Sequence, residues 1–249
     1  MRAGASAGLL VLVLLAAAPA LADSAYDNLV LASSPVLYYP SAANGNALAG
    51  SPNASCTGTV SFGTTITPFI KGVTASLGCL AATASGWNLG GSSGNTLEAW
   101  LLFPNGYVAQ EVPLGNSRPT SYTQAAIVTN GAFGIGSNFT SHFYDNAGSD
   151  LSTTGQFNGQ PVYWVANCTA GFTCTIYINN VSQGTTTWAY NDNLGQGPNL
   201  GWGTATVAVA AIASYNSQLS GATMTAHYNC GLLGTGPACP HGGPMVIGE

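Results

Sequence analysis

The sequence has very few charged side chains. Among its 249 residues, lysine and arginine together number 3 and aspartate and glutamate 8, which gives 4% charged residues and a formal net charge of −5. A protein that binds nucleic acid neutralises phosphates with many basic side chains, and a helix that lies on a membrane surface carries a basic face. Both of these partners are therefore excluded. The chain is 46% hydrophobic and 10% aromatic, so it can build a core despite the missing charge.

The sequence also lacks the common catalytic motifs. It contains no Gly-x-Ser-x-Gly motif for a serine nucleophile, and its three histidines have no recognisable partner arrangement. Glycoside hydrolysis needs two facing carboxylates, but Glu98 has no second acid nearby and Glu111 lies beyond a Pro-Asn-Gly turn. We therefore expect no catalytic residue and no enzymatic activity. For His227 we expect a packing or capping role in a terminal helix.

Residues 1–22 have the organisation of a secretory signal peptide. Arg2 supplies a short positive region, residues 9–18 form an apolar stretch, and residues 20–22 form a small-x-small cleavage site. The apolar stretch is too short to span a bilayer comfortably. We expect cleavage after Ala22, no transmembrane segment in the mature chain, and a secreted protein, extracellular or at the cell surface.

The 6 cysteines form three pairs that are close in the sequence. An oxidising compartment favours disulfides, and no Cys/His spacing typical of a zinc site occurs. Six cysteines allow about 15 sets of pairings, so the sequence favours bridges between neighbours without fixing them. The favoured bridges are Cys56/Cys79, Cys168/Cys174 and Cys230/Cys239.

Asn-x-Ser/Thr sequons begin at Asn53, Asn138, Asn167 and Asn180. Glycans at these sites would supply the hydration that the missing charges do not. A chain rich in Asn, Ser and Thr also forms sequons by chance, and we expect about half of them to be used.

Short runs of Val, Ile, Tyr, Phe and Trp separated by Gly, Ser, Thr and Asn predict an all-β fold, an antiparallel jelly-roll β-sandwich. Asn179 and Asn180 suit a hairpin turn that needs positive φ. One short C-terminal helix is expected over residues 221–229, with Ser220 as its N-cap and Gly231 as its stop. The expected strands are 28–31, 36–39, 96–103, 124–129, 139–144, 162–167, 174–178 and 207–215.

Four segments resemble, in order, the laminin-G-like, concanavalin A-like jelly-roll domains. They are a "SPVLYY" strand that ends at Tyr39, the "LEAW" of residues 97–100, the "WVA" and "TIYINN" of 164–180, and the "IASYNSQLS" and "AHY" of 212–228. The resemblance covers about residues 26–230 and implies the sandwich fold and a binding role. The usual Asp-Gly turn is replaced by the loop between Cys168 and Cys174, and a usual acidic pair by two alanines, which removes charges that could serve a metal or ligand.

Sugar recognition pairs an aromatic face with amide or carboxylate hydrogen bonds. The candidates for the rim of a ligand site are Trp188, Tyr190, Asn191, Asp192, Asn193, Trp87 and Trp202. No cofactor is required by any motif. Calcium takes carboxylate oxygens, and the resemblance implies a site between loops, but hydrated turns use the same residues for their own backbone. The candidate calcium ligands are Asp145, Asp150 and Asp192.

These observations predict a jelly-roll domain over residues 23–230, followed by a Gly/Pro-rich tail over 231–249. The predicted function is non-catalytic recognition or adhesion, with an extracellular glycan or glycoprotein as partner. The alternative is a structural subunit of a coat, fibre or surface layer. A surface with so little charge lacks the repulsion that keeps proteins apart, so self-association is compatible with it. A glycoside hydrolase is the third and weakest hypothesis.

Overall fold

The structure is a computed structural model of the chain. It describes residues 25–40, 43–50, 53–75, 79–80, 94–104, 142–144, 150–152, 159–171, 173–187, 199–200, 207–234 and 239.

The largest element is an antiparallel sheet of eight strands. Seven of them follow the order β11-β10-β9-β6-β13-β4-β3, and the eighth, β1, pairs with β13. Strand β13 is central, because it pairs with β6 on one side and with both β4 and β1 on the other. The strands of this sheet are β1 (Leu37–Tyr39), β3 (Val60–Thr65), β4 (Lys71–Ala75), β6 (Asn95–Leu102), β9 (Pro161–Cys168), β10 (Thr173–Ile178), β11 (Val181–Thr187) and β13 (Ala208–Tyr215).

Two smaller sheets complete the described β structure. One has the order β12-β5-β2 and the other pairs β7 with β8. Their strands are β2 (Ser55–Cys56), β5 (Cys79–Leu80), β7 (His142–Tyr144), β8 (Asp150–Ser152) and β12 (Asn199–Leu200).

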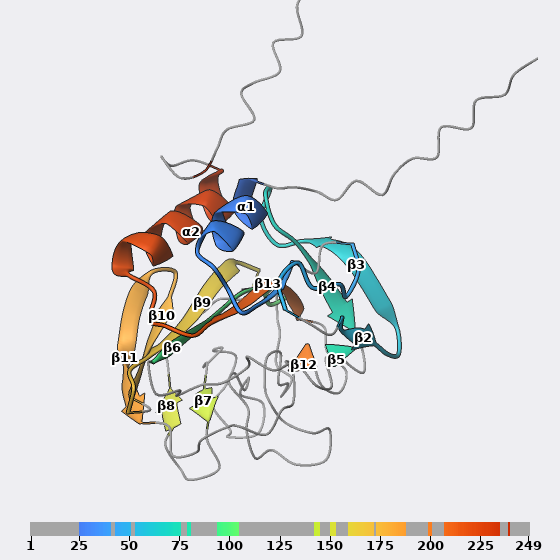
Figure 1. Ribbon diagram of the computed structural model, residues 1–249. Coiled ribbons are helices and arrows are strands. Elements are labelled where there is room, and N and C mark those ends of the chain that lie inside the picture. The colour runs from blue at the N-terminus through green and yellow to red at the C-terminus, as the bar shows by residue number, and fades with distance from the viewer. Residues whose placement is uncertain are drawn as a thin grey trace, which may run out of the picture.

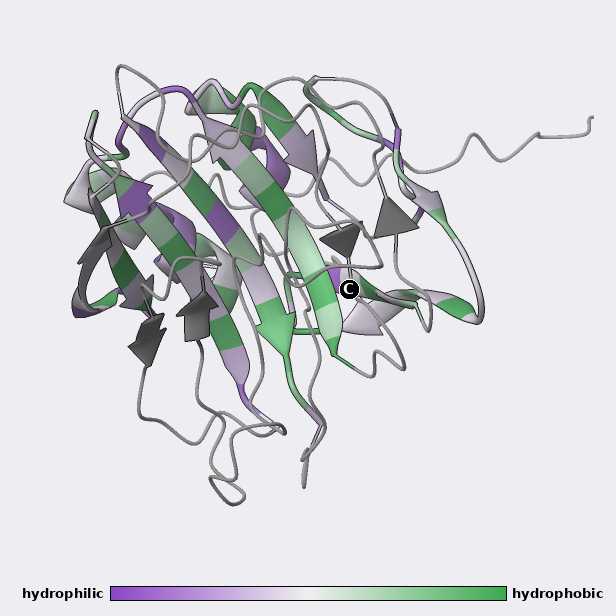
Figure 2. Ribbon diagram, turned by 90° about the horizontal axis from the view of Figure 1, so that it is seen from below, coloured by the Kyte–Doolittle hydropathy of each residue, from purple (hydrophilic) through white to green (hydrophobic). Residues whose placement is uncertain are grey.

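Helices α1 (Ala25–Ala32) and α2 (Gly221–Leu233) lie side by side over one face of the large sheet (Figure 1). Beneath them, side chains of Trp100, Tyr163 and Val165 pack against Val30 and Met224. The opposite face carries a second apolar cluster that includes Leu97 and Trp164 and meets residues of the β2 region. Hydrophilic bands interrupt the hydrophobic ones along strands of the sheet (Figure 2). The predicted all-β antiparallel sandwich is therefore confirmed.

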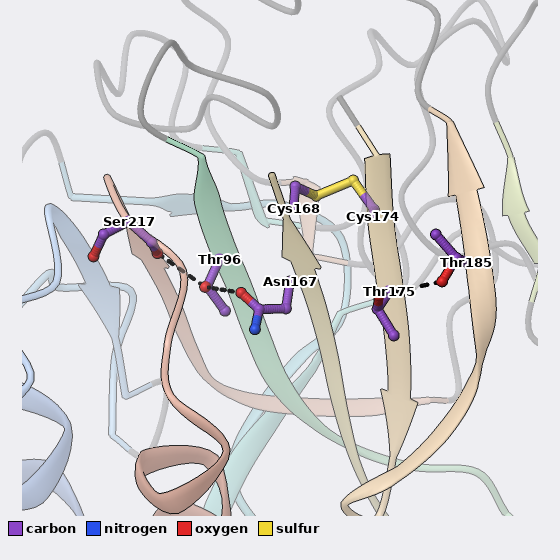
Figure 3. Close-up of a disulfide and its surroundings, with 7 residues drawn as sticks. All are labelled: Thr96, Asn167, Cys168, Cys174, Thr175, Thr185 and Ser217. Carbon is purple, nitrogen blue, oxygen red and sulfur yellow. Dashed lines mark hydrogen bonds between the residues drawn. A yellow bond between two sulfur atoms is a disulfide. The ribbon is translucent and has the colours of Figure 1, made fainter. Parts of the chain in front are cut away.

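The predicted local signals are partly confirmed. Asn179 and Asn180 have φ of 50° and 66° and form the turn between β10 and β11. Disulfides join Cys168 to Cys174 and Cys230 to Cys239. The first of these crosses directly between β9 and β10, where the two residues are register partners (Figure 3). Cys56 is also disulfide-bonded, and its register partner in β5 is Cys79.

Several predicted elements differ in the structure. The predicted strand 28–31 is wrong, because these residues lie in helix α1, a second helix that was not expected. The short apolar run Leu29-Val30-Leu31 does not by itself distinguish strand from helix. Predicted strand 124–129 lies outside the described residues, and of 139–144 only β7 is described. Strands β3 and β4 were not predicted, since they are rich in Ser, Thr and Gly.

Helix α2 begins as predicted and ends later. The side chain of Ser220 accepts a hydrogen bond from the Thr223 backbone N–H, so Ser220 is the N-cap. Gly231 as the helix stop is wrong: the helix continues to Leu233, and Gly234 takes the left-handed conformation at its end. The predicted domain boundary after residue 230 therefore falls inside the helix. Gly231 is needed for packing, because a Cβ there would lie 2.5 Å from Cζ2 of Trp100.

This close approach predicts that Gly231→Ala lowers the stability of the protein. Alanine favours a helix over glycine by about 1 kcal/mol, but overpacking a filled core costs about 1–3 kcal/mol. We expect a lower midpoint of thermal unfolding, measured by circular dichroism. Gly221→Ala is the matched control, because a Cβ at Gly221 in the same helix meets no atom within 4 Å. Equal effects of the two substitutions would contradict this packing argument.

Candidate functional site

A buried carboxylate lies between the large sheet and the two helices. It belongs to Glu98 of β6, whose side chain is 0% exposed between the apolar residues Leu97 and Ala99. Tyr163 of β9 donates its hydroxyl to Oε2, and Tyr215 of β13 donates to Oε1 at 2.6 Å. Both neighbouring strands of the sheet therefore hold the carboxylate.

His227 of α2 is the third partner of this carboxylate. Its Nδ1 lies 2.9 Å from Oε2 and 3.1 Å from Oε1 of Glu98, and the ring is fully buried. On the far side of the ring, Nε2 lies 3.0 Å from Oγ of Ser33, the residue after α1. The Ser33 hydroxyl in turn donates to the Leu29 carbonyl at 3.3 Å. The chain of contacts thus joins α1, α2 and three strands of the sheet; we call these residues (Ser33, Glu98, Tyr163, Tyr215 and His227) the Glu98 cluster.

Further polar contacts surround the Glu98 cluster. The indole N–H of Trp100 donates to the Tyr26 hydroxyl at 3.0 Å, and the Tyr26 ring meets the His227 ring at a steep angle. Tyr38 of β1 donates its hydroxyl to Asp27 of α1. Helix α1 is therefore tied to the sheet by hydrogen bonds of its own.

The surroundings shift the pKa values of Glu98 and His227 in opposite directions. Burial acts to raise the pKa of Glu98, but the charge of His227 and the hydrogen bonds from His227 and the two tyrosines outweigh it and leave the pKa below its ordinary value. Burial acts to lower the pKa of His227, but the charge and hydrogen bond of Glu98 raise it above its ordinary value. An imidazolium at this position donates to Glu98 from Nδ1 and to Ser33 from Nε2.

The order Ser33, His227, Glu98 matches that of a serine, base and acid in acyl transfer. The chemistry requires a neutral imidazole that accepts the serine proton, whereas here the raised pKa favours imidazolium. It also requires donors for an oxyanion. The backbone N–H groups of Ser33, Ser34 and Val36 all bond to carbonyls, and Pro35 has none. The contacts of the Glu98 cluster link both helices to the sheet, and Glu98 is fully buried.

Of the ligand and metal residues predicted from the sequence, only Asp150 lies in the part of the chain that the structure describes. Strand β8 includes the backbone of Asp150. Outside the described residues lie Trp87, Asp145, Trp188, Tyr190, Asn191, Asp192, Asn193 and Trp202. Among the residues that the structure describes, no three His, Cys, Asp or Glu side chains gather as a metal site. Within the same residues, no helix has the length and hydrophobicity needed to span a membrane.

The sequons occupy different environments. Asn53 is exposed, and its Oδ1 accepts a hydrogen bond from the Ala47 backbone. Asn180 is half-buried and donates to Thr225. The predicted glycosylation of Asn167 is corrected by its surroundings. Its Nδ2 is buried and donates to the Leu219 carbonyl, which leaves no room for a glycan in the folded chain. Asn138 lies outside the described residues.

No protein-family model matches this sequence, and no curated protein does. Solved structures share its fold at low sequence identity. The botulinum neurotoxin serotype D binding domain matches 83% of this chain with a TM-score of 0.55 and 10% identity. The Trypanosoma rangeli sialidase, in complex with 2,3-difluorosialic acid, matches 80% with a TM-score of 0.57 and 11% identity. A structure of the serotype D ligand-binding domain in complex with N-acetylneuraminic acid matches 83%, with a TM-score of 0.53 and 10% identity.

The match covers only part of each of these proteins. This chain spans 52% of each of the two serotype D domains and 33% of the sialidase. These neighbours support a β-sandwich fold for this chain.

Proposed function

We propose that this chain is a secreted recognition or adhesion module of the laminin-G-like kind that binds extracellular carbohydrate or glycoprotein without transforming it. One observation carries the proposal: the chain shares its fold with a ligand-binding domain whose structure is in complex with N-acetylneuraminic acid. The disulfides suit an oxidising compartment outside the cytosol. The raised pKa of His227 in the Glu98 cluster supports a role without catalysis, because it favours imidazolium, which cannot accept a serine proton.

The ligand rim proposed from the sequence contains Trp188, Tyr190 and the amides that follow. An aromatic ring stacks on the apolar face of a pyranose, and amides bond its hydroxyls. Calcium binding by the candidate aspartates stays a prediction, as does glycosylation of Asn53, Asn138 and Asn180.

A glycan array tests this function. We expect the wild-type protein to retain particular sugars, and Trp188→Ala to weaken their binding by about tenfold or more, because aromatic anchors carry much of a binding energy. Phe69→Ala is the matched control, since it removes an aromatic ring that is 47% exposed in the loop between β3 and β4. Unchanged retention by Trp188→Ala would argue against this rim.

A structural, self-associating subunit is the second candidate function. Phe69 and Leu233 are exposed, and both lie at the C-terminal end of α2, where the Phe69 ring closes on Gly234. Exposed apolar side chains that adjoin are typical of contact sites. Retention of no sugar, together with concentration-dependent assembly in light scattering, would favour this function over recognition.

A further inference from the structure

Strand β4 begins with an exposed lysine, Lys71. Its Nζ donates a hydrogen bond at 2.6 Å to Oγ1 of Thr65, the exposed residue that faces it on β3. Among the residues that the structure describes, no carboxylate lies within ion-pair distance of this ammonium group. Because an ammonium group has three donors, two of them are left for another partner.

Basic side chains are scarce in this chain. Lysine and arginine number 3 in the whole sequence, and they are Arg2, Lys71 and Arg118. Arg2 belongs to the predicted signal peptide, so a chain cut after Ala22 keeps the other two. Arg118 lies outside the described residues. Lys71 is therefore the basic side chain whose surroundings the structure shows.

The charges that the fold buries already have partners. Asp27 accepts a hydrogen bond from Tyr38, and Glu98 is paired with His227. An exposed lysine gains little stability from an ion pair and is well solvated by water. The charge of Lys71 takes part in none of the buried contacts and is available to a ligand.

An exposed aromatic ring lies on the same face as Lys71. In the register of β3 and β4, Lys71 pairs with Thr65. Val73, two residues further along β4, pairs with Phe62. Alternate residues of a strand share a face, so Phe62 and Lys71 are diagonal neighbours, a separation of about 7–8 Å that long and aromatic side chains span. The Phe62 side chain is 37% exposed.

A β-bulge in β3 brings the ring to this face. The register shifts between Phe62 and Thr64, and Gly63 between them has a φ of 78°. Side chains three residues apart on a regular strand point to opposite faces, but the bulge adds one residue, so Phe62 and Thr65 share a face. Strand β3 is the last strand at its edge of the large sheet (Figure 1). The cation and the ring are therefore both open to a ligand at this edge.

The chemistry of these side chains selects a class of ligand. A lysine ammonium group binds an anionic oxygen through a charge-assisted hydrogen bond. An aromatic ring packs against the apolar face of a pyranose. The two contacts together fit a saccharide that carries an acidic group, a carboxylate or a sulfate, whereas a neutral saccharide uses the ring alone.

We propose that Lys71 and Phe62 form a binding site for acidic saccharides on the β3–β4 hairpin. The acidic group binds the ammonium group, which Thr65 orients, and the sugar ring packs on Phe62. The inference rests on the function proposed above and gives it a ligand class and a site outside the rim predicted from the sequence.

Glycan pairs that differ only in an acidic group test the proposal. One series ends in a sugar that carries a carboxylate, a second carries a sulfate, and each glycan has its neutral parent. We expect the wild-type protein to bind the acidic member about fivefold more tightly, the effect of one exposed ion pair, and this preference to shrink at high salt. Lys71→Met should bind both members alike, and Lys71→Arg should keep the preference.

Arg118→Met is the matched control, because it removes the other basic side chain of the mature chain, and it should keep the acidic preference. Phe62→Ala should weaken the binding of both members of a pair. The midpoint of thermal unfolding shows that each variant is folded. Lys71→Met should keep the wild-type midpoint, because only an exposed hydrogen bond is lost.

The outcomes separate this inference from the proposed function. An acidic preference that Lys71→Met keeps, or that Arg118→Met abolishes, overturns the inference. A wild-type protein that retains only neutral glycans also overturns it and leaves the proposed function standing. Retention of no glycan by the wild-type protein overturns the proposed function, and the inference with it.

Discussion

Glu98→Gln is expected to lower the free energy of unfolding by about 3–5 kcal/mol, the cost of breaking a buried ion pair by removing one partner. The carboxylate accepts from Tyr163, Tyr215 and His227. A glutamine has the same shape, but its NH₂ group is a donor and turns toward these donors. His227 also loses the anion that keeps it charged in a buried place. Urea denaturation followed by tryptophan fluorescence measures the loss.

A double-mutant cycle shows whether the loss belongs to the pair. Residues that act through one contact couple, so Glu98→Gln with His227→Gln should cost clearly less than the sum of the single changes. Tyr215→Phe is the milder comparison, because it removes one hydrogen bond to a charged group, about 1.5–3 kcal/mol. A loss below about 1 kcal/mol for Glu98→Gln would mean that the carboxylate does not hold the helices.

The strands were predictable where the pattern was strong. Strands β6, β9, β10 and β13 lie close to their predicted ranges, because long apolar or alternating runs bounded by turn residues have few other interpretations. The helix cap at Ser220 and the turn at Asn179 and Asn180 were predictable because their side chains satisfy or permit one local backbone geometry.

The elements that sequence reasoning missed depend on contacts far apart in the chain. Helix α1 is stabilised by burial of Tyr26 and Val30 against the sheet and against α2, and its short sequence does not require a helix. The local sequence favours Gly231 as a helix stop. In the structure, Gly231 lies inside the helix, because its missing side chain lets Trp100 pack against it. In both cases tertiary packing overrides the local signal.

The Glu98 cluster was missed for a related reason. The sequence pattern expected of a catalytic carboxylate is a second acid on the same strand, whereas Glu98 pairs with a base 129 residues away. One signal was present: a glutamate among apolar residues of a strand must have a partner if its side chain points inward, and His227 lies in a helix expected to pack on the sheet. The residues proposed for the ligand rim lie in segments without a clear helix or strand periodicity. For such segments the sequence gives the residue types but does not place them in the fold.

The same buried pair is expected to make the protein most stable between about pH 4.5 and pH 6.5. The pKa of Glu98 is lowered from its ordinary 4.5, so its contribution is present above that pH and is lost as the pH falls through the folded value. The pKa of His227 is raised from its ordinary 6.5, so its contribution is present below that pH and is lost as the pH rises through the folded value. The charged or titratable groups that face the pair are Tyr26, Tyr163 and Tyr215; burial raises their pKa values above the ordinary 10.0, so they stay neutral in this range.

Urea denaturation at about pH 5.5 and about pH 8.5 measures the histidine side of this profile, where one proton gives a slope of at most ~1.4 kcal/mol per pH unit. The wild-type free energy of unfolding should fall between these two values, and that of His227→Gln should fall much less. The buried tyrosines add a loss only above about pH 10, where they ionise in the unfolded chain, so they do not contribute to a fall near neutral pH. A wild-type profile that is flat over this range, or one that His227→Gln leaves unchanged, would show that folding does not raise the pKa of His227. A free energy of unfolding that rises from about pH 5.5 to about pH 8.5 would show that the histidine is neutral in the fold.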